Sequence, residues 1–299
     1  MWTKPWTMKE GFLVGGGLIL AGLMLELSIG PVVWEQLAWP VNGIVLAGFL
    51  TFICSMFLWR KRVYAFRFIG TYQAAIPALM YAVVLTIIMG LTRQEAHGAW
   101  LKNMLTFWPF VLVYVYMAVI LGVVILHRLR RMFNGQRSLG NDIPFLLNHL
   151  GLFLVMTTAT LGNADMQRLK MITVVGEPER RALTQEGIVR VMPLAIELKQ
   201  FIMETYDDGS PKRFASKILI KTKSGKHIET TVDVNKPVEV DGWKIYQYDY
   251  DTLMGAMSQT SVLELVSDPW LPFVYTGIYM MLAGAGGIII KGKKLKGKN

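Results

Sequence analysis

Histidine offers the widest range of chemistry in this sequence. Four are present: His97, His127, His149 and His227. His149 stands apart, because it follows Pro144 and Asn148 inside an apolar stretch, where an ionisable side chain is costly and usually marks a functional site. Neutral imidazole is also a common axial ligand of haem iron. Two interpretations of His149 therefore stay open: a hydrogen bond between helices, or ligation of a metal or haem.

The other histidines have simpler interpretations. His97 lies in a loop before an apolar stretch, where it is a second ligand at the outer surface or a plain loop residue. His127 ends an apolar stretch among arginines, and we expect an ordinary interfacial position. His227 follows a turn at the start of a strand, and we expect it to be solvated.

Few other residues suggest chemistry. The sequence has no phosphate-binding glycine loop, no His-Glu-x-x-His and no nucleophile elbow. The single cysteine, Cys54, excludes an intrachain disulfide and a Cys-x-x-Cys pair. Glu26 is a charge inside an apolar stretch that either reaches the interface or handles a proton or cation. We expect the glycines at 15–17 and 284–287 to let helices approach closely.

The composition is that of a membrane protein. Hydrophobic residues make up 53% of the chain and charged residues 17%, below the roughly 25% of ordinary soluble domains. A helix needs about 20 apolar residues to cross a bilayer. Six stretches qualify, at 12–29, 41–59, 72–91, 104–126, 143–161 and 269–290.

The positive charge indicates how these spans are oriented. Lys and Arg cluster on alternate sides of the spans, at 4–9, 60–67, 128–137 and 291–298. By the positive-inside rule both termini are cytoplasmic. The outer segment 163–268 holds more acidic than basic residues, so the net charge of +10 reflects topology and gives no support to a nucleic-acid partner.

The segment 163–268 has the pattern of an antiparallel sheet. Short alternating stretches occur at 171–175, 194–206, 214–222, 227–234 and 243–251, separated by turn residues such as Ser224-Gly225-Lys226. We expect a small sandwich or open barrel with one wet face. Aromatic residues alternate along 243–251; they form either a core strand or a docking surface for a partner.

Three stretches resemble the ResB (CcsB) family of System II cytochrome c biogenesis membrane proteins. The first is Asn148-His149-Leu150-Gly151-Leu152-Phe153-Leu154 with Thr160-Leu161-Gly162. The second is Val234-Asn235-Lys236-Pro237-Val238 with Gly242-Trp243-Lys244-Ile245-Tyr246-Gln247, where Lys236 replaces a frequent histidine. The third is 261–270, before the last span. Better-known members have three spans before the outer domain and this chain has five, which suggests a Bacteroidetes-type variant.

The resemblance implies a subunit that works with a ResC (CcsA)-type partner to carry haem outward for attachment to apocytochrome c. His149 would be one axial ligand of an intramembrane haem, opposite a histidine of the partner. The partner's tryptophan-rich haem-handling motif is absent from this chain. Attachment would accordingly belong to the complex, and the chain is not expected to be catalytic alone.

The sequence thus predicts a polytopic α-helical protein of the bacterial inner membrane, with one extracytoplasmic β domain between its last two spans. The expected parts are a four-span region at 1–140, the histidine-bearing span at 141–162, the periplasmic β domain at 163–268, and a final span with a basic tail at 269–299. Two rival functions stay open. One is a structural assembly subunit without haem, and the other is a small-solute transporter lined by Glu26, Pro77 and His149.

Overall fold

The computed structural model describes residues 2–95, 98, 100–135 and 139–296. The chain divides into two compact units, one formed by Met1–Ala164 with Trp270–Asn299 and the other by Asp165–Pro269. We refer to them as the helical unit and the β unit. Each is described by itself below.

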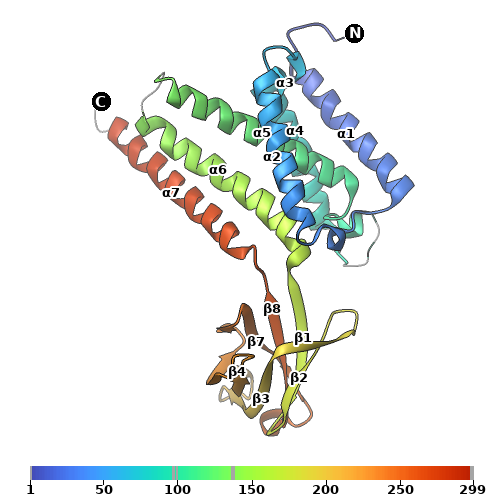
Figure 1. Ribbon diagram of the computed structural model, residues 1–299, viewed down its shortest axis with the longest axis vertical. Helices are drawn as coiled ribbons and strands as arrows, with labels where there is room; N and C mark the ends of the chain where they lie inside the picture. The colour runs from blue at the N-terminus through green and yellow to red at the C-terminus, as the bar shows by residue number, and fades with distance from the viewer. Residues whose placement is uncertain (1, 96–97, 99, 136–138, 297–299) are drawn as a thin grey trace. The chain divides into compact units, whose positions relative to one another are not determined.

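Within the described part of the helical unit, six helices are long and apolar enough to cross a membrane, as the sequence predicts. Their bounds are α1 Met8–Ile29, α2 Val41–Trp59, α4 Tyr72–Leu91, α5 Trp108–Phe133, α6 Leu139–Gly162 and α7 Leu271–Lys296 (Figure 1). A short helix, α3, spans Tyr64–Ile69. The fourth span differs from expectation: it starts later and runs seven residues beyond 126, because Arg130 and Arg131 continue the helix past its apolar part.

Local chemistry explains where these helices begin and end. Thr7 and Glu10 form a capping box at the start of α1, and Gly30, with φ of 77°, ends it. Pro109 lies in the first turn of α5, where its missing N–H costs nothing. Pro144 interrupts the backbone hydrogen bonding of α6 within its second turn.

Glycines bring the helices α6 and α7 into backbone contact. A Cβ atom on Gly151 would lie 2.5 Å from the carbonyl oxygen of Gly277, and one on Gly284 would lie 2.8 Å from the backbone nitrogen of Asn148. In α1, Gly15 makes room for the ring of Tyr81. The predicted packing faces are therefore present, although a Cβ on Gly17 or Gly286 would meet nothing within 4 Å.

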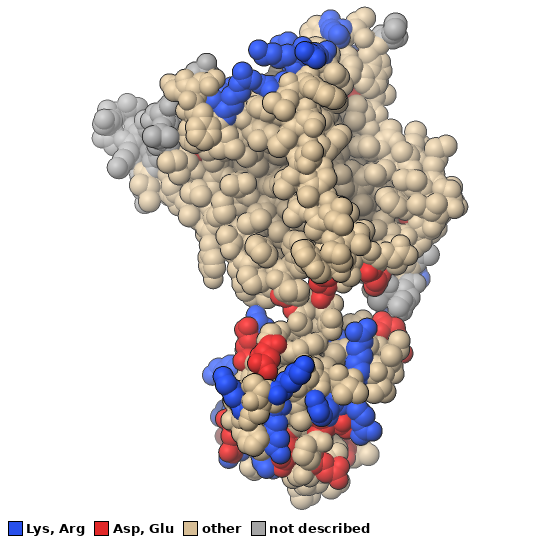
Figure 2. Space-filling view, in the orientation of Figure 1, with Lys and Arg blue, Asp and Glu red and all other residues tan. Residues whose placement is uncertain are grey.

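The surface of the helical unit is apolar along its length and basic at one end. Figure 2 shows a broad tan belt, with Lys and Arg gathered over the end that holds the start of α1 and the α2–α3 turn. Many large side chains in this belt are exposed, including Leu20, Met24, Ile44 and Leu91. Exposed apolar side chains on this scale fit a lipid-facing surface.

The β unit is one antiparallel sheet of eight strands. Its strands are β1 Gln167–Val174, β2 Pro178–Leu183, β3 Val189–Thr205, β4 Pro211–Lys221, β5 His227–Asp233, β6 Val238–Val240, β7 Trp243–Tyr250 and β8 Thr260–Ser267. They are ordered β5-β4-β3-β2-β1-β8-β7-β6. The predicted antiparallel sheet is confirmed, and β2, β6 and β8 are strands that the alternation pattern did not reveal.

The sheet curls around a core that includes a polar network. Gln247 of β7 is 3% exposed and accepts hydrogen bonds from Ser216 of β4 at 2.5 Å and Ser261 of β8 at 2.9 Å. The two serine hydroxyls also bond to each other at 2.8 Å, and the Gln247 amide donates to the carbonyl of Asp249. Gln247 of the family-like stretch thus ties three strands together.

The aromatic residues of β7 are divided between two environments. Tyr250 stacks on Phe201 and Phe214, with ring centroids 4.8 and 4.9 Å away, and Trp243 packs against the apolar core. Tyr248 is 51% exposed, with the ammonium of Lys170 over its ring. Tyr248 lies on the outer face of the alternation, and the register shift between Gln247 and Asp249 turns Tyr250 to the inner face. Only part of the stretch is therefore a core strand.

Candidate functional site

The candidate site lies on the face of α6 that is turned toward α5. Asp142, Phe145 and His149 follow one another at helical spacing, and the first two contact Arg128 of α5. The face that packs on α7 is different, because it consists of Pro144, Asn148 and Gly151. His149 is therefore not part of the closely packed α6–α7 contact.

A buried ion pair anchors this face. The guanidinium Nε of Arg128 lies 2.6 Å from Oδ1 of Asp142, whose side chain is fully buried, while that of Arg128 is 17% exposed. The guanidinium also lies over the ring of Phe145, 4.4 Å from its centroid. One arginine thus fixes two residues of the α6 face, which include the ring on which His149 rests.

The imidazole of His149 is held from one side and left free on the other. Its Nδ1 is 2.9 Å from the carbonyl oxygen of Phe145, and its ring stacks on the Phe145 ring at a centroid distance of 3.7 Å. A carbonyl oxygen can only accept, so Nδ1 carries the proton and Nε2 keeps its lone pair in the neutral ring. Nε2 has no hydrogen-bond partner among the residues that the structure describes. The side chain is half-buried, so the free nitrogen is not sealed inside a helix contact.

Of the other histidines, the two that the structure describes do not join this site. His97 lies outside the described residues. His127 packs edge-on against Phe57 and close to Gly70, and His227 is exposed at the start of β5.

Glu26 has a structural partner that sequence analysis missed. Its side chain is 7% exposed, and Oε2 accepts a hydrogen bond of 3.2 Å from the backbone N–H of Trp108, the first residue of α5. A carboxylate at a helix N-terminus is stabilised by the helix dipole. Arg128, beside the His149 site, is twenty residues further along α5, about 30 Å at 1.5 Å per residue, so Glu26 and His149 do not line one short path.

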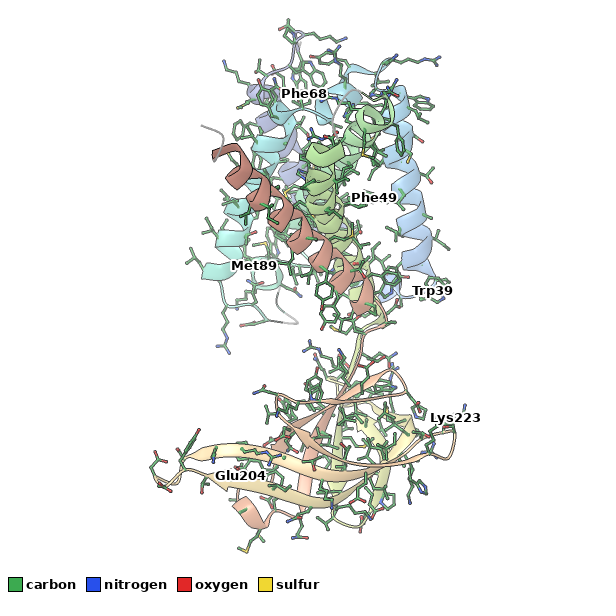
Figure 3. All side chains as sticks on the ribbon, turned by 90° about the vertical axis from the view of Figure 1, so that its left-hand side faces the viewer. Trp39, Phe49, Phe68, Met89, Glu204 and Lys223 are labelled. Carbon is green, nitrogen blue, oxygen red and sulfur yellow. The ribbon has the colours of Figure 1, made fainter. Side chains whose placement is uncertain are left out.

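An apolar cavity of about 260 Å³ lies between α2, α5 and α6. Phe49 of α2, labelled in Figure 3, lines it and stacks with Phe153 of α6 at 6.3 Å. Tyr114 of α5 and Thr157 of α6 also line the cavity. His149 is not part of its wall, and the volume is below the roughly 300–1,000 Å³ of typical ligand pockets.

Direct coordination of a metal by several side chains has no support in the described part of the chain. No group of three or more His, Cys, Asp or Glu side chains there could hold a metal ion. A cofactor that brings most of its own ligands, and needs one imidazole from the protein, suits this arrangement better.

Comparison with known proteins places the site within a recognised sequence family. Residues 127–258 match the ResB-like family. The cytochrome c biogenesis protein CcsB of Prochlorococcus marinus subsp. pastoris is 27% identical over 155 residues, 51% of this chain and 35% of that protein. The protein of the same name from a Synechococcus species is 29% identical over 133 residues, 44% of this chain and 30% of that protein. The matched part therefore spans about a third of these relatives.

Among solved structures, the chain titled Cytochrome c Heme Lyase CcmF aligns with 96% of this chain and 46% of its own length. The TM-score is 0.42 and the sequence identity 13%. A similarity of this size says nothing about shared function.

Proposed function

We propose, from the match of residues 127–258 to the ResB-like family, that the chain is a subunit of a cytochrome c maturation complex. In this proposal it works with a ResC/CcsA-type membrane protein to pass haem across the membrane to apocytochrome c. His149 supplies one axial nitrogen to the haem iron, and the partner supplies the other.

The geometry of His149 is the observation that supports this role. Its Nδ1–H is directed to the carbonyl of Phe145, the arrangement that fixes the tautomer and ring orientation of metal-binding histidines. Its Nε2 is left as the ligand atom. The ring of Phe145 and the neighbouring apolar residues of α6 exclude water from one side, and a second subunit would cover the half-exposed side.

The basic end of the helical unit supports an orientation. The last turns of α5, which hold Arg128, and the α2–α3 turn lie at this end (Figure 1), which we assign to the cytoplasm by the positive-inside rule. The β unit follows the opposite end of α6 along the chain, so we assign it to the periplasm, where apocytochrome c is found. The membrane is then the bacterial inner membrane. The lysines after residue 290, whose side chains lie outside the described residues, are assigned to the cytoplasmic side as well.

Co-purification with the partner tests the proposal. The complex is isolated, and its haem is quantified by the pyridine haemochrome spectrum, for the parent chain and for His149→Ala. We expect haem to be largely lost from the variant while the two proteins still co-purify. The variant His149→Gly should regain the haem spectrum when imidazole is added, because free imidazole can occupy the vacated position.

His127→Ala is the matched control, since His127 is another half-buried histidine on a neighbouring helix. It should leave the haem content unchanged. Full haem content in His149→Ala would contradict the ligand role. A complex of parent chains that forms without any haem would favour the assembly-subunit alternative.

A further inference from the structure

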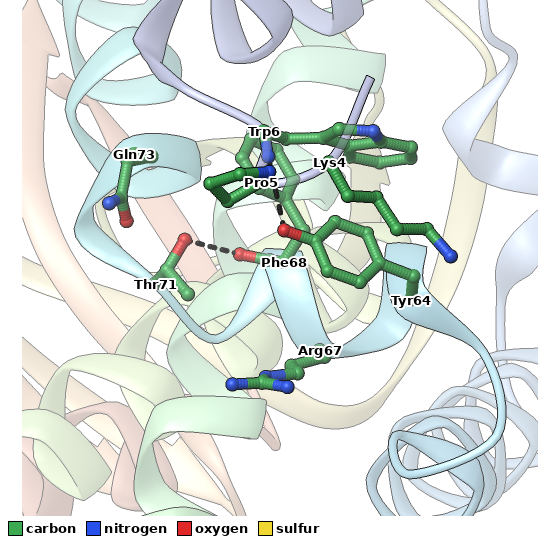
Figure 4. A pocket seen from close by; sticks show the side chains of 8 residues that line it. All are labelled: Lys4, Pro5, Trp6, Tyr64, Arg67, Phe68, Thr71 and Gln73. Atoms are coloured by element: carbon green, nitrogen blue, oxygen red, sulfur yellow. Dashed lines mark hydrogen bonds between the residues drawn. The ribbon is translucent and has the colours of Figure 1, made fainter. Parts of the chain in front are cut away.

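A second cavity lies at the basic end of the helical unit, far along the chain from His149. It has a volume of about 380 Å³, is open to the surface, and is lined by the segment before α1, by α3 and by the start of α4 (Figure 4). The residues that line this cavity lie outside the match to the ResB-like family, which begins at residue 127.

Aromatic side chains form a fixed wall of this cavity. Trp6 meets the rings of Tyr64 and Phe68 edge-on, each with centroids 5.2 Å apart. The backbone N–H of Trp6 donates to the hydroxyl of Tyr64 at 3.0 Å, as Figure 4 shows. The segment before α1 is thereby pinned to α3, which gives the cavity a defined shape.

Two cations line the cavity, and no acidic side chain does. They are Lys4, whose ammonium lies 4.8 Å from the centroid of the Tyr64 ring, and Arg67 of α3. Neither forms an ion pair with a residue that the structure describes. The nearest carboxylate along the chain, that of Glu10, is already occupied by the backbone N–H and hydroxyl of Thr7 at 2.6 and 2.8 Å. The positive charge of the cavity is therefore not neutralised from within.

Hydrogen-bond donors without acceptors occur on residues that line the cavity, among them Trp6 and Gln73. Thr71 is the N-cap residue of the 20-residue helix α4, yet its hydroxyl donates to the carbonyl of Phe68 at 2.6 Å and does not cap the helix. In the described part of the chain, the backbone N–H groups of Tyr72 and Gln73 have no hydrogen-bond partner. The indole Nε1 of Trp6 is also buried without an acceptor there. Buried donors are normally paired, so the Trp6 indole is the donor for which an acceptor is missing, while the first turn of α4 begins at the exposed Tyr72.

We propose that this cavity binds a phosphate group. A phosphate matches two unpaired cations, a helix N-terminus and a set of unused donors, because it combines negative charge with several acceptor oxygens. Phospholipid headgroups and free inorganic phosphate both carry this group. The exposed apolar belt next to the cavity makes a headgroup with its acyl chains in the surrounding bilayer the natural source.

The test compares two variants that lose the same charge. The cavity variant carries Lys4→Gln with Arg67→Gln, and the control variant carries Lys61→Gln with Arg62→Gln, which are exposed cations of the α2–α3 turn outside the cavity wall. Full-length protein is placed in phosphatidylcholine nanodiscs doped with phosphatidylglycerol, and retained phosphatidylglycerol is counted by native mass spectrometry. In parallel, radiolabelled inorganic phosphate is titrated by equilibrium dialysis in neutral detergent.

The cavity variant should bind the phosphate-bearing probe roughly thirtyfold more weakly, and the control variant should change by less than about threefold. Retention of phosphatidylglycerol with no saturable phosphate binding identifies a lipid site, and saturable phosphate binding identifies a site for the free anion. Equal losses in both variants, or no selective binding by the parent, would overturn the proposal. Lys4→Gln alone, checked by circular dichroism, replaces the double variant if that variant misfolds.

Discussion

The helical unit and the β unit treat their buried polar groups in different ways. In the β unit, Ser216, Gln247 and Ser261 satisfy one another inside the core. In the helical unit, the buried side chains of Glu26, Asn42 and Thr158 bond to backbone groups, and Asp142 pairs with Arg128. His149 differs from both cases, because its Nδ1 is hydrogen-bonded and its Nε2 has no partner among the described residues.

We interpret this difference as a division between polar groups that stabilise the fold and polar groups that bind a ligand. A network whose members bond to one another has no capacity left for a ligand, so the Gln247 network serves the fold. The half-bonded imidazole of His149 lies in a helix apolar enough to cross a membrane, where an ionisable side chain is costly and is by default the hypothesis of a functional site. We therefore expect changes in the β network to alter stability alone, and changes near His149 to alter haem binding as well.

The largest expected effect is that of Asp142→Ala, which leaves the Arg128 guanidinium mostly buried without its counter-ion. Removing one member of a buried ion pair costs about 3–5 kcal/mol. Denaturant-induced unfolding of the chain in detergent micelles measures this loss. Replacing both residues, by Asp142→Leu with Arg128→Met, should recover most of the stability. A single variant as stable as the parent would show that the pair is not buried.

A smaller loss should follow from Gly284→Ala, because the new methyl group would lie 2.8 Å from backbone atoms of both Asn148 and Pro144. Overpacking of this kind costs about 1–3 kcal/mol. Gly286→Ala is the matched control, since a Cβ there meets nothing within 4 Å. The same unfolding assay should separate the two variants. Equal stabilities would mean that α6 and α7 do not pack closely.

In the β unit, Gln247→Leu should cost about 0.5–1.5 kcal/mol, because Ser216 and Ser261 keep each other as partners and lose only their bonds to the amide. The haem content of the complex should not change. Tyr248→Leu, at a 51% exposed position of the same strand, serves as the control for stability. A loss of haem with Gln247→Leu would break the proposed separation of roles.

The smallest effect concerns pH. Hydrogen bonds from the side chain and backbone of Arg181 lower the pKa of Glu179 to about 2. A lowered folded-state pKa stabilises the fold above the usual value of about 4.3, and this contribution disappears as the pH falls toward 2. Glu179→Gln should therefore lower stability by under about 1 kcal/mol at neutral pH, the range of exposed ion pairs. An unfolding difference that stays constant down to pH of about 3 would contradict this.

Hydropathy was sufficient to predict the six spans, because a run of about 20 apolar residues can be recognised from the local sequence alone. The strand β8 was missed because its place in the sheet depends on β1, which is distant in the sequence. The strand β2 was missed because its residues Pro178–Leu183 include three charged side chains and show no apolar alternation. Arg128 was interpreted only as a topology signal and Asp142 was not considered. An aspartate two residues before Pro144 in a span was the signal available. Which arginine pairs with Asp142 depends on how α5 and α6 pack, and the sequence alone does not determine that packing.

The central claim is that the imidazole of His149 touches haem iron. The most direct measurement is the reduction potential and axial-ligand spectrum of the complex purified with His149→Met. A thioether in place of a nitrogen ligand raises the potential, so we predict a raised potential with a changed ligand spectrum, or loss of the haem. Unchanged haem content with an unchanged potential and spectrum would contradict the claim.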